Sequence, residues 1–180
     1  MVYLFLAEGF EEIEALCPVD MLRRADIPTA TVSVTGKKEV RGAHGITVTA
    51  DLLYSETDLA DADMLVLPGG MPGTMGLLAC DALVSTLKIF AKSGGLVAAI
   101  CAAPMVLGRA GILEGKVATC YPGFENELSG ATVSKDKVVV CDNIITAAGM
   151  GVAIDFSCAL IDAIRGEGAS QKIKNAIQCP

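Results

Sequence analysis

Hydrophobic residues occur along this chain in short unbroken runs, separated by segments of helical periodicity. Runs without polar alternation are typical of strands that are buried on both faces of a parallel sheet. The runs of strand length are VYLFLA from residue 2, TATVSV from residue 29, DMLVLPGG from residue 63, LVAAI from residue 96, KVVVCDN from residue 137 and IITAAG from residue 144. The last two are neighbours in sequence, and we expect them to pair with each other.

Between these runs, apolar residues recur three or four positions apart, which predicts amphipathic helices. Helices are expected over 11–25 and in CDALVSTLKIFAKSGG from residue 80, APMVLGRAGIL from residue 103, AIDFSCALIDAIRG from residue 153 and SQKIKNAIQ from residue 170. Pro18 is expected to kink or interrupt the first helix, because proline lacks an amide donor. A short polar helix is expected in SETDLADA from residue 55, where Ser55 and Asp58 have the spacing of a capping box.

Strands that alternate with helices favour a flavodoxin-like three-layer α/β/α sandwich with a mostly parallel central sheet. The segment EVRGAHGITVTAD from residue 39 contains two short β-rich pieces around glycines, so a small antiparallel addition is expected there. A chain of 180 residues without a low-complexity linker is most simply one domain, 1–180. Such sheets bind ligands beyond the carboxyl ends of their strands, here at the loops 8–14, 68–72 and 101–104.

Composition narrows the range of partners. Hydrophobic residues make up 52% of the chain and aromatic residues 4%, with no tryptophan, which suits an aliphatic core. No apolar run reaches the roughly 18 residues that a membrane helix requires, and the N-terminus lacks a basic flank, so neither a membrane span nor a signal peptide is expected. The net charge of −7 and the scattered basic residues argue against nucleic acid as a partner.

The seven cysteines show no regular spacing and no C-x-x-C motif, and His44 is the only histidine. A structural zinc site needs spaced Cys/His pairs, so no metal is expected. No cofactor is expected either, since no G-x-G-x-x-G fingerprint follows a strand. Most of the thiols lie in apolar runs, where free cysteine packs as a small hydrophobe. A reduced, cytoplasmic protein fits this usage of cysteine.

Cys101 stands between the strand LVAAI and a helix that begins near Pro104, which is the layout of a nucleophile elbow. The amides and the dipole of a helix start favour a thiolate, so we expect the pKa of this thiol to lie below its usual value of about 8.5. The alternative is inert packing, the commoner state of a cysteine at an apolar strand end. Acidic residues in GFEEIEA and the bare amides of LPGG lie at the same edge of the sheet and favour a reactive cysteine.

Four segments occur in a characteristic order: LAEGFEEIEALCPVDMLRRADI, DMLVLPGGMPG, GLVAAICAAP and AIDFSCALIDAI. In this order and spacing the chain resembles the DJ-1/ThiJ/PfpI family of the class I glutamine amidotransferase-like superfamily, and AAICAAP with G-x-E-E-x-E upstream resembles its DJ-1-like branch. The resemblance implies that Cys101 is the reactive cysteine and Glu14 its protonated acidic partner. It also implies that the backbone amides of Gly70 and Ala102 face the sulfur.

The chain departs from other branches of this superfamily. Related proteases carry histidine directly after the cysteine, where this chain has Ala102, and glutamine amidotransferases need a downstream His-x-Glu, whereas no histidine follows Cys101. Both activities are therefore disfavoured. DJ-1-like glyoxalases have an assisting histidine near a T-x-x-P stretch, which here reads ATCYPG, so either Cys120 or Tyr121 takes its place.

Further expectations about the pocket come from the same resemblance. It places His44 near the pocket mouth and a dimer interface, with Arg24 lining the same region, although a lone histidine is more often simply solvated. GMGV at 149–152 stands where relatives have Gly-Pro-Gly-Thr, which makes the pocket wall more apolar. A homodimer is implied, with VRGAHG from residue 40 in its interface.

Two functions are compatible with a reactive Cys101. The first is a cofactor-independent enzyme on small reactive aldehydes, either a glyoxalase of the single-enzyme type that converts methylglyoxal to lactate or a protein deglycase. The second is a non-enzymatic redox sensor or stress chaperone, in which an oxidant converts Cys101 to a sulfinic acid. In this second case Cys120 is a candidate resolving thiol.

Overall fold

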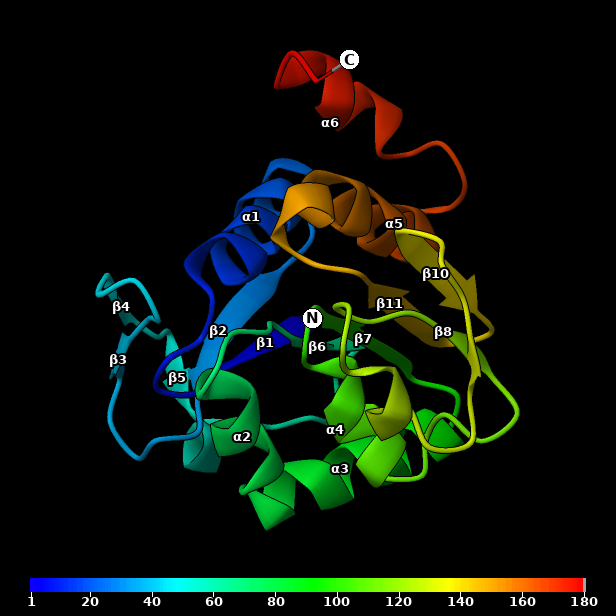
Figure 1. Cartoon of the computed structure of the whole chain (residues 1–180). Helices are drawn as coiled ribbons and strands as arrows, with labels where there is room; N and C mark the ends of the chain where they lie inside the picture. The colour runs from blue at the N-terminus through cyan, green and yellow to red at the C-terminus, as the bar shows by residue number, and fades with distance from the viewer. Residues whose placement is uncertain (180) are drawn as a thin grey trace.

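A seven-stranded sheet forms the centre of the computed structural model, which describes residues 1–179 (Figure 1). The strand order is β10-β11-β7-β6-β1-β2-β5, and neighbouring strands are parallel except for the β10–β11 pair. The unbroken apolar runs become central strands because both faces of the sheet are covered. The strands are β1 (Val2–Leu6), β2 (Thr29–Ser33), β5 (Leu52–Leu53), β6 (Met64–Leu67), β7 (Leu96–Ile100), β10 (Val138–Cys141) and β11 (Ile144–Ala147).

Helices cover both faces of this sheet, as Figure 1 shows. One face carries α1 (Glu12–Arg24) and α5 (Ala153–Arg165), with α6 (Gln171–Ala176) beyond them, and the other carries α2 (Gly73–Leu78), α3 (Asp81–Lys92) and α4 (Pro104–Arg109). Two hydrophobic clusters fill the spaces between sheet and helices, one on each side. The predicted three-layer α/β/α sandwich is therefore confirmed. No helix of residues 1–179 has the length and apolar character needed to cross a membrane.

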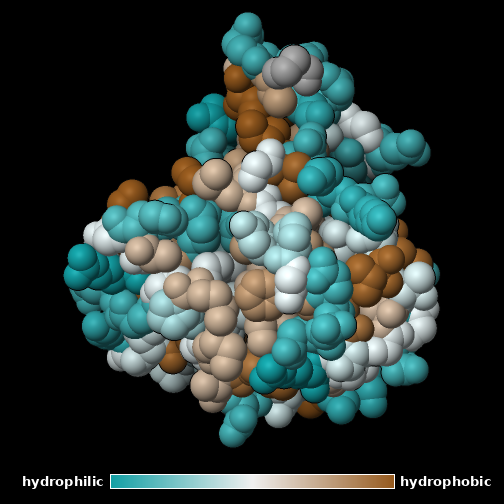
Figure 2. Space-filling view, viewed as in Figure 1, coloured by the Kyte–Doolittle hydropathy of each residue, from teal (hydrophilic) through white to brown (hydrophobic). Residues whose placement is uncertain are grey.

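Two small sheets lie apart from the central one. The antiparallel pair β3 (Glu39–Arg41) and β4 (Thr47–Thr49) confirms the predicted addition. A parallel pair, β8 (Val117–Ala118) and β9 (Thr132–Val133), was not predicted, because two-residue strands leave no periodic signal. The molecular face in Figure 2 mixes hydrophilic and hydrophobic residues, and hydrophobic residues gather at the base of α6.

Two local expectations differ from the structure. Pro18 does not interrupt α1, because the packing of α1 against α5 holds a helix that lacks one internal hydrogen bond. The expected helix after residue 55 is only a 3-10 turn, Tyr54–Glu56. The turn does not continue as a helix, because the Asp58 side chain makes a local hydrogen bond instead of a capping box with Ser55. The Asp58 carboxylate accepts from the Ala60 amide at 3.0 Å. Helix α2 was also missed, since it is short and carries two glycines.

The topology brings the predicted loops together. Strand β1 lies between β2 and β6. The chain adds β2 and β5 on one side of β1, and then adds β6, β7, β11 and β10 on the other side. The carboxyl ends of β1, β6 and β7 therefore meet at the point where the strand order reverses, which is where open α/β sheets bind ligands.

Candidate active site

Cys101 occupies a strained turn between β7 and α4. Its φ angle is 65°, a left-handed conformation that residues other than glycine rarely adopt. Two backbone hydrogen bonds hold it there: the Cys101 amide donates to the Ala147 carbonyl at 2.8 Å, and the Cys101 carbonyl accepts from the Tyr121 amide at 2.8 Å. Strain of this kind persists only where the surroundings enforce it, and it is common at active sites.

Glu14 faces this cysteine from the first turn of α1. The Glu14 side chain is buried, and its Oε2 accepts a hydrogen bond from the Gly69 amide at 3.0 Å. Glu11 is the N-cap of the helix, and its Oε2 accepts from the Glu14 amide at 2.7 Å. The helix start thus fixes the position of Glu14 relative to the end of β6.

The two glycines after β6 permit this close approach. A Cβ atom on Gly69 would lie 2.5 Å from Glu14 Oε2 and 2.7 Å from Cys101 Cβ. Gly70 has a φ angle of 88°, and a Cβ there would overlap the Glu11 amide. Side chains at either position would therefore push the carboxyl, the cysteine and the helix start apart.

Burial governs the protonation of the pair. It raises the pKa of Glu14 to about 7, even though hydrogen bonds to Cys101 and Gly69 act in the opposite direction. Burial, together with the charge of an ionised Glu14, raises the pKa of Cys101 to about 12, although the facing amides of Gly70 and Ala102 lower it. The expectation of a thiol pKa below its usual value is therefore wrong while Glu14 is ionised. Near pH 7 the pair is therefore losing the first of its two protons, and in the form that keeps one proton a thiolate exists at Cys101 only when that proton is on Glu14.

Of the two residues in the ATCYPG stretch, Tyr121 lies beside the pair. A Cβ on Gly149 would lie 3.2 Å from the Tyr121 ring and 3.9 Å from Glu14 Oε1. Cys120 is buried in the hydrophobic cluster on the α2–α4 side, whereas Cys101 packs against the other cluster. Burial raises the pKa of Cys120 to about 11.

His44 and Arg24 lie at opposite ends of α1. The His44 ring Nδ1 is 2.8 Å from Glu12 Oε2, at the start of the helix. Arg24 pairs with Asp20 at 2.6 Å in the last turn. Ten residues of helix separate Arg24 from Glu14, about 15 Å along the axis. The structure therefore brings His44, but not Arg24, to the end of α1 that carries Glu14.

A cavity of about 340 Å³ lies at the turn GMGV, and its lining includes Tyr121, Lys137, Gly149, Met150 and Val152. Its closest link to the pair is Gly149, where a Cβ would lie 3.9 Å from Glu14 Oε1. The Met150 amide lowers the pKa of Glu14, and the Met150 side chain is half exposed. The contacts that the backbone amides of Gly69 and Met150 make with Glu14 carried no signal in the sequence. The sequence predicts bare amides in LPGG at this edge of the sheet, but the closeness of Gly69 to Glu14 depends on packing.

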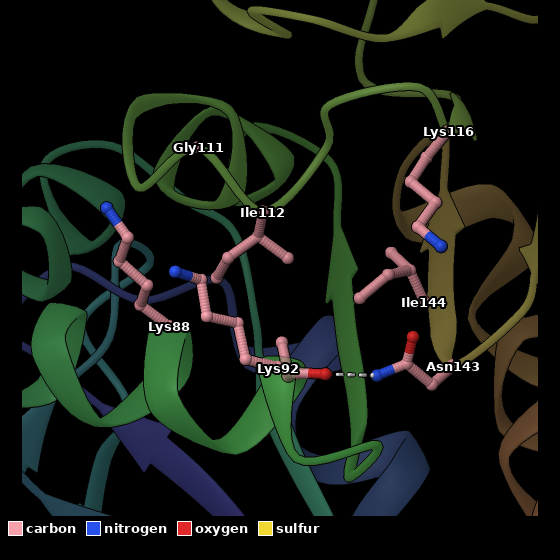
Figure 3. Close-up of a pocket in the computed structure, with 8 residues that line it drawn as sticks. Lys88, Lys92, Gly111, Ile112, Lys116, Asn143 and Ile144 are labelled. Carbon is pink, nitrogen blue, oxygen red and sulfur yellow. Dashed lines mark hydrogen bonds between the residues drawn. The ribbon is translucent and has the colours of Figure 1, made fainter.

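A second cavity, of about 220 Å³, lies near the amino ends of β7 and β11 (Figure 3). Lysine side chains from α3 and from the segment before β8 surround it, and the Asn143 amide donates to the carbonyls of Ala91 and Gly95 at 2.9 and 2.8 Å. Neither cysteines nor carboxylates line it. It is separate from the Cys101 turn, which lies at the carboxyl end of β7.

The fold and the turn define a parallel α/β protein with a buried cysteine–carboxyl pair at the reversal of the strand order. A family model described as the DJ-1/PfpI family matches residues 1–163. The chain belongs to this family.

Similarity to known proteins extends over most of the chain. The chain is 36% identical to "Protein DJ-1 homolog A" of Arabidopsis thaliana over 98% of its own length, and the match covers 46% of that relative. The chain thus spans less than half the length of this plant relative. It is 32% identical to "Glutathione-independent glyoxalase DJR-1.2" of Caenorhabditis elegans, covering 88% of this chain and 85% of the relative.

Solved structures agree with the fold. The structure titled "Toxoplasma gondii DJ-1, oxidized" superposes with a TM-score of 0.94 at 35% identity, covering 98% of this chain and 97% of the other. At this identity and coverage, the likeness extends across the strands and helices that position Cys101.

Proposed function

We propose that the protein is a cofactor-independent enzyme that acts on small 2-oxoaldehydes through Cys101, as a glyoxalase that forms lactate from methylglyoxal or as a protein deglycase. The observation that supports it most strongly is the strained Cys101 turn facing Glu14, a buried carboxyl whose pKa is raised to about 7. A relative that is 32% identical carries the name of a glutathione-independent glyoxalase.

The first step needs a thiolate. With the proton on Glu14, the Cys101 sulfur adds to the aldehyde carbon, a C–S bond forms, and the carbonyl electron pair moves to oxygen. That oxygen takes a proton to give a hemithioacetal. The amides of Gly70 and Ala102 face the sulfur, where they stabilise the thiolate before addition.

The next steps move a proton between two carbons. The Glu14 carboxylate, free after it has given its proton to the new hydroxyl group, removes the proton from the former aldehyde carbon, and the electron pair moves to the neighbouring carbonyl oxygen to give an enediolate. Return of the proton to the neighbouring carbon gives a thioester of a 2-hydroxy acid. Water then hydrolyses the thioester, which releases lactate and restores the thiol. The overall reaction adds one water to methylglyoxal and needs no external oxidant or reductant.

A non-enzymatic redox role is the second candidate. The same amides and the same protonated Glu14 would hold the oxygens of a Cys101 sulfinic acid, formed by successive reaction of the thiolate with two molecules of peroxide. Mild peroxide treatment followed by peptide mass spectrometry tests this role. Oxidation of Cys101 to a level no higher than that of the other six cysteines would exclude it.

Lactate formation tests the enzymatic role directly. Purified protein is incubated with methylglyoxal without glutathione, and lactate is measured enzymatically. We expect turnover in the wild type, none in Cys101→Ala, and wild-type turnover in Cys120→Ala, the matched cysteine control. A wild-type rate equal to that of Cys101→Ala would overturn the proposal.

We also propose a homodimer, as the family resemblance implies, and a reduced, cytoplasmic location. In the single chain, Ile46, which directly follows the predicted 40–45 interface segment, is 56% exposed, and Ile13 in α1 is 50% exposed. All seven cysteines are free thiols, which suits a reducing compartment. Light scattering after gel filtration should give twice the chain mass for the wild type and the single mass for Ile46→Glu. A wild-type mass of one chain would refute the dimer.

A further inference from the structure

We propose that Glu11, Glu12 and His44 form a binding site for a divalent transition metal ion, with Zn²⁺ as the representative. The three side chains meet where the start of α1 contacts the turn between β3 and β4. Their nearest oxygen and nitrogen atoms all lie within 4.8 Å of one another. The His44 ring Nδ1 is 2.8 Å from Glu12 Oε2 and 3.9 Å from Glu11 Oε1.

The two separations from His44 are close to those found between ligand atoms around one zinc ion. Zinc bonds to imidazole nitrogen and carboxylate oxygen are about 2.0–2.2 Å long, so ligand atoms around one ion lie about 3–3.5 Å apart. The observed 2.8 and 3.9 Å lie on either side of this range, and His44 is 70% exposed and can adjust. Two carboxylates and one imidazole form a donor set that suits zinc and its neighbours in the first transition row.

Each carboxylate is already oriented by the backbone. Glu12 Oε1 accepts hydrogen bonds from the amides of His44 and Ile46 at 2.8 and 3.4 Å, which leaves Oε2 for a metal ion. Glu11 Oε2 accepts from the Glu14 amide at 2.7 Å, which leaves Oε1. Hydrogen bonds that orient the metal-binding side chains are a regular feature of metal sites.

The hairpin is shaped to accept the Glu12 carboxylate. A Cβ on Gly42 would overlap the Glu12 carboxyl group, so the close approach of the β3–β4 turn to α1 requires glycine there. This close approach involves the same Glu12 carboxyl group that would bind the ion. It makes the arrangement a specific contact between two elements, not a chance gathering of acidic groups on a surface.

Charge also favours a cation at this place. The side chains of Glu11 and Glu12 are only 12% and 4% exposed. Among residues 1–179, His44 is the one basic side chain found within 4 Å of either carboxylate. Two nearly buried carboxylates with a single imidazole leave a net negative charge, which a divalent ion would neutralise.

His44 is 32 residues from Glu12 in sequence, so no Cys/His spacing motif could reveal the site. The proposal does not rest on Cys101 chemistry. Because zinc also binds thiolates, its test must separate the two sites.

The single histidine makes the test sharp. Protein treated with EDTA and dialysed is titrated with ZnCl₂ by calorimetry, on the wild type, His44→Ala, Glu12→Gln and Cys101→Ala. Glu39→Gln is the matched control, because Glu39 is an exposed carboxylate of the same hairpin. We expect one Zn²⁺ per chain in the wild type, Cys101→Ala and Glu39→Gln, and at least a tenfold weaker affinity in His44→Ala and Glu12→Gln.

A second readout follows the imidazole itself. In protein labelled with ¹⁵N-histidine, the spectrum contains only His44, and zinc should shift its Nδ1 resonance at one equivalent. His44 is 70% exposed in the single chain, and the thermal melt and gel-filtration mass of His44→Ala, compared with the wild type, check that the variant keeps its fold and assembly. Zinc affinity that is unchanged in His44→Ala, or lost in Cys101→Ala, would overturn the proposal, as would an unshifted Nδ1 resonance at saturation.

Discussion

Replacing Gly69 by alanine tests whether the close approach of Glu14 to Cys101 is required for function. The substitution adds one methyl group at the end of β6. Gly69 does not have a positive φ angle, so the backbone tolerates alanine. The new Cβ would lie 2.5 Å from Glu14 Oε2, 2.7 Å from Cys101 Cβ and 3.0 Å from the Ile100 carbonyl oxygen.

The size of the effect follows from these distances. Ordinary contacts of a Cβ atom are 3.4 Å or longer, so the Glu14 carboxyl and the cysteine must each move away from the new methyl group by about 1 Å. A misplacement of about 1 Å at reacting groups can cost about 100-fold in rate, or about 2.7 kcal/mol in the barrier. Overpacking of this kind costs about 1–3 kcal/mol in stability, which lowers Tm by several degrees in a protein of this size.

Initial rates of lactate formation from methylglyoxal measure the first effect, and a thermal melt measures the second. Gly151→Ala is the matched control: it adds the same methyl group in the turn beside the pocket, where a Cβ meets nothing within 4 Å. We expect kcat/KM to fall about 100-fold in Gly69→Ala and to change by less than about threefold in Gly151→Ala.

The reasoning fails if Gly69→Ala remains folded and retains kcat/KM within threefold of the wild type. The carboxyl and the thiol would then not need their observed separation, and Glu14 would not be the group that moves the proton. If Gly69→Ala melts below the assay temperature, it is compared with the wild type at a lower temperature, where both are folded.

Three further predictions follow from other contacts. Glu14→Gln keeps the shape of the side chain but removes the base, so lactate formation should fall by about 10²–10⁴-fold, and a loss of less than tenfold would contradict its role. Burial raises the pKa of Cys120 to about 11, so this thiol should stay protonated near neutral pH, and non-reducing peptide maps after peroxide should lack a Cys101–Cys120 disulfide; detection of that disulfide would refute this. Burial raises the pKa of Asp51, but hydrogen bonds from the amide and hydroxyl of Thr31, with the charge of Arg23, leave that pKa below its usual value. The ionised form of Asp51 therefore stabilises the fold above about pH 4. The Tm advantage of the wild type over Asp51→Asn should therefore be greatest near pH 7 and shrink as the pH falls from 4 toward 2, and a constant difference would show that the charge of Asp51 contributes nothing.

The strands of the central sheet were predictable because their burial on both faces is visible in the local sequence. A strand buried on both faces needs an apolar residue at nearly every position, and the runs that form β1, β6 and β11 meet that condition. The course of α1 through Pro18 was not predictable. The stabilisation that keeps this helix continuous comes from α5, more than a hundred residues further along the chain.

The position of Cys101 between a strand and a helix was also predictable from the sequence, since both elements are contiguous with it. The side chains that face Cys101 were not predictable in this way. GFEEIEA supplies three glutamates at the start of α1, and helical geometry points residues 11, 12 and 14 in different directions. The resemblance to relatives indicated Glu14, but only the packing of α1 against the sheet and the hairpin shows what each glutamate does.

Three side chains of one chemical type thereby acquire three environments. Glu14 is buried against Gly69 and Cys101, Glu12 is held by the amides of the β3–β4 turn, and Glu11 caps the helix. The sequence by itself determined which groups reach this edge of the sheet, because strand ends and helix starts are local features. The tertiary structure decided which of them touch, because those contacts join segments about 30 to 90 residues apart, whose relative positions depend on the packing of the whole sheet.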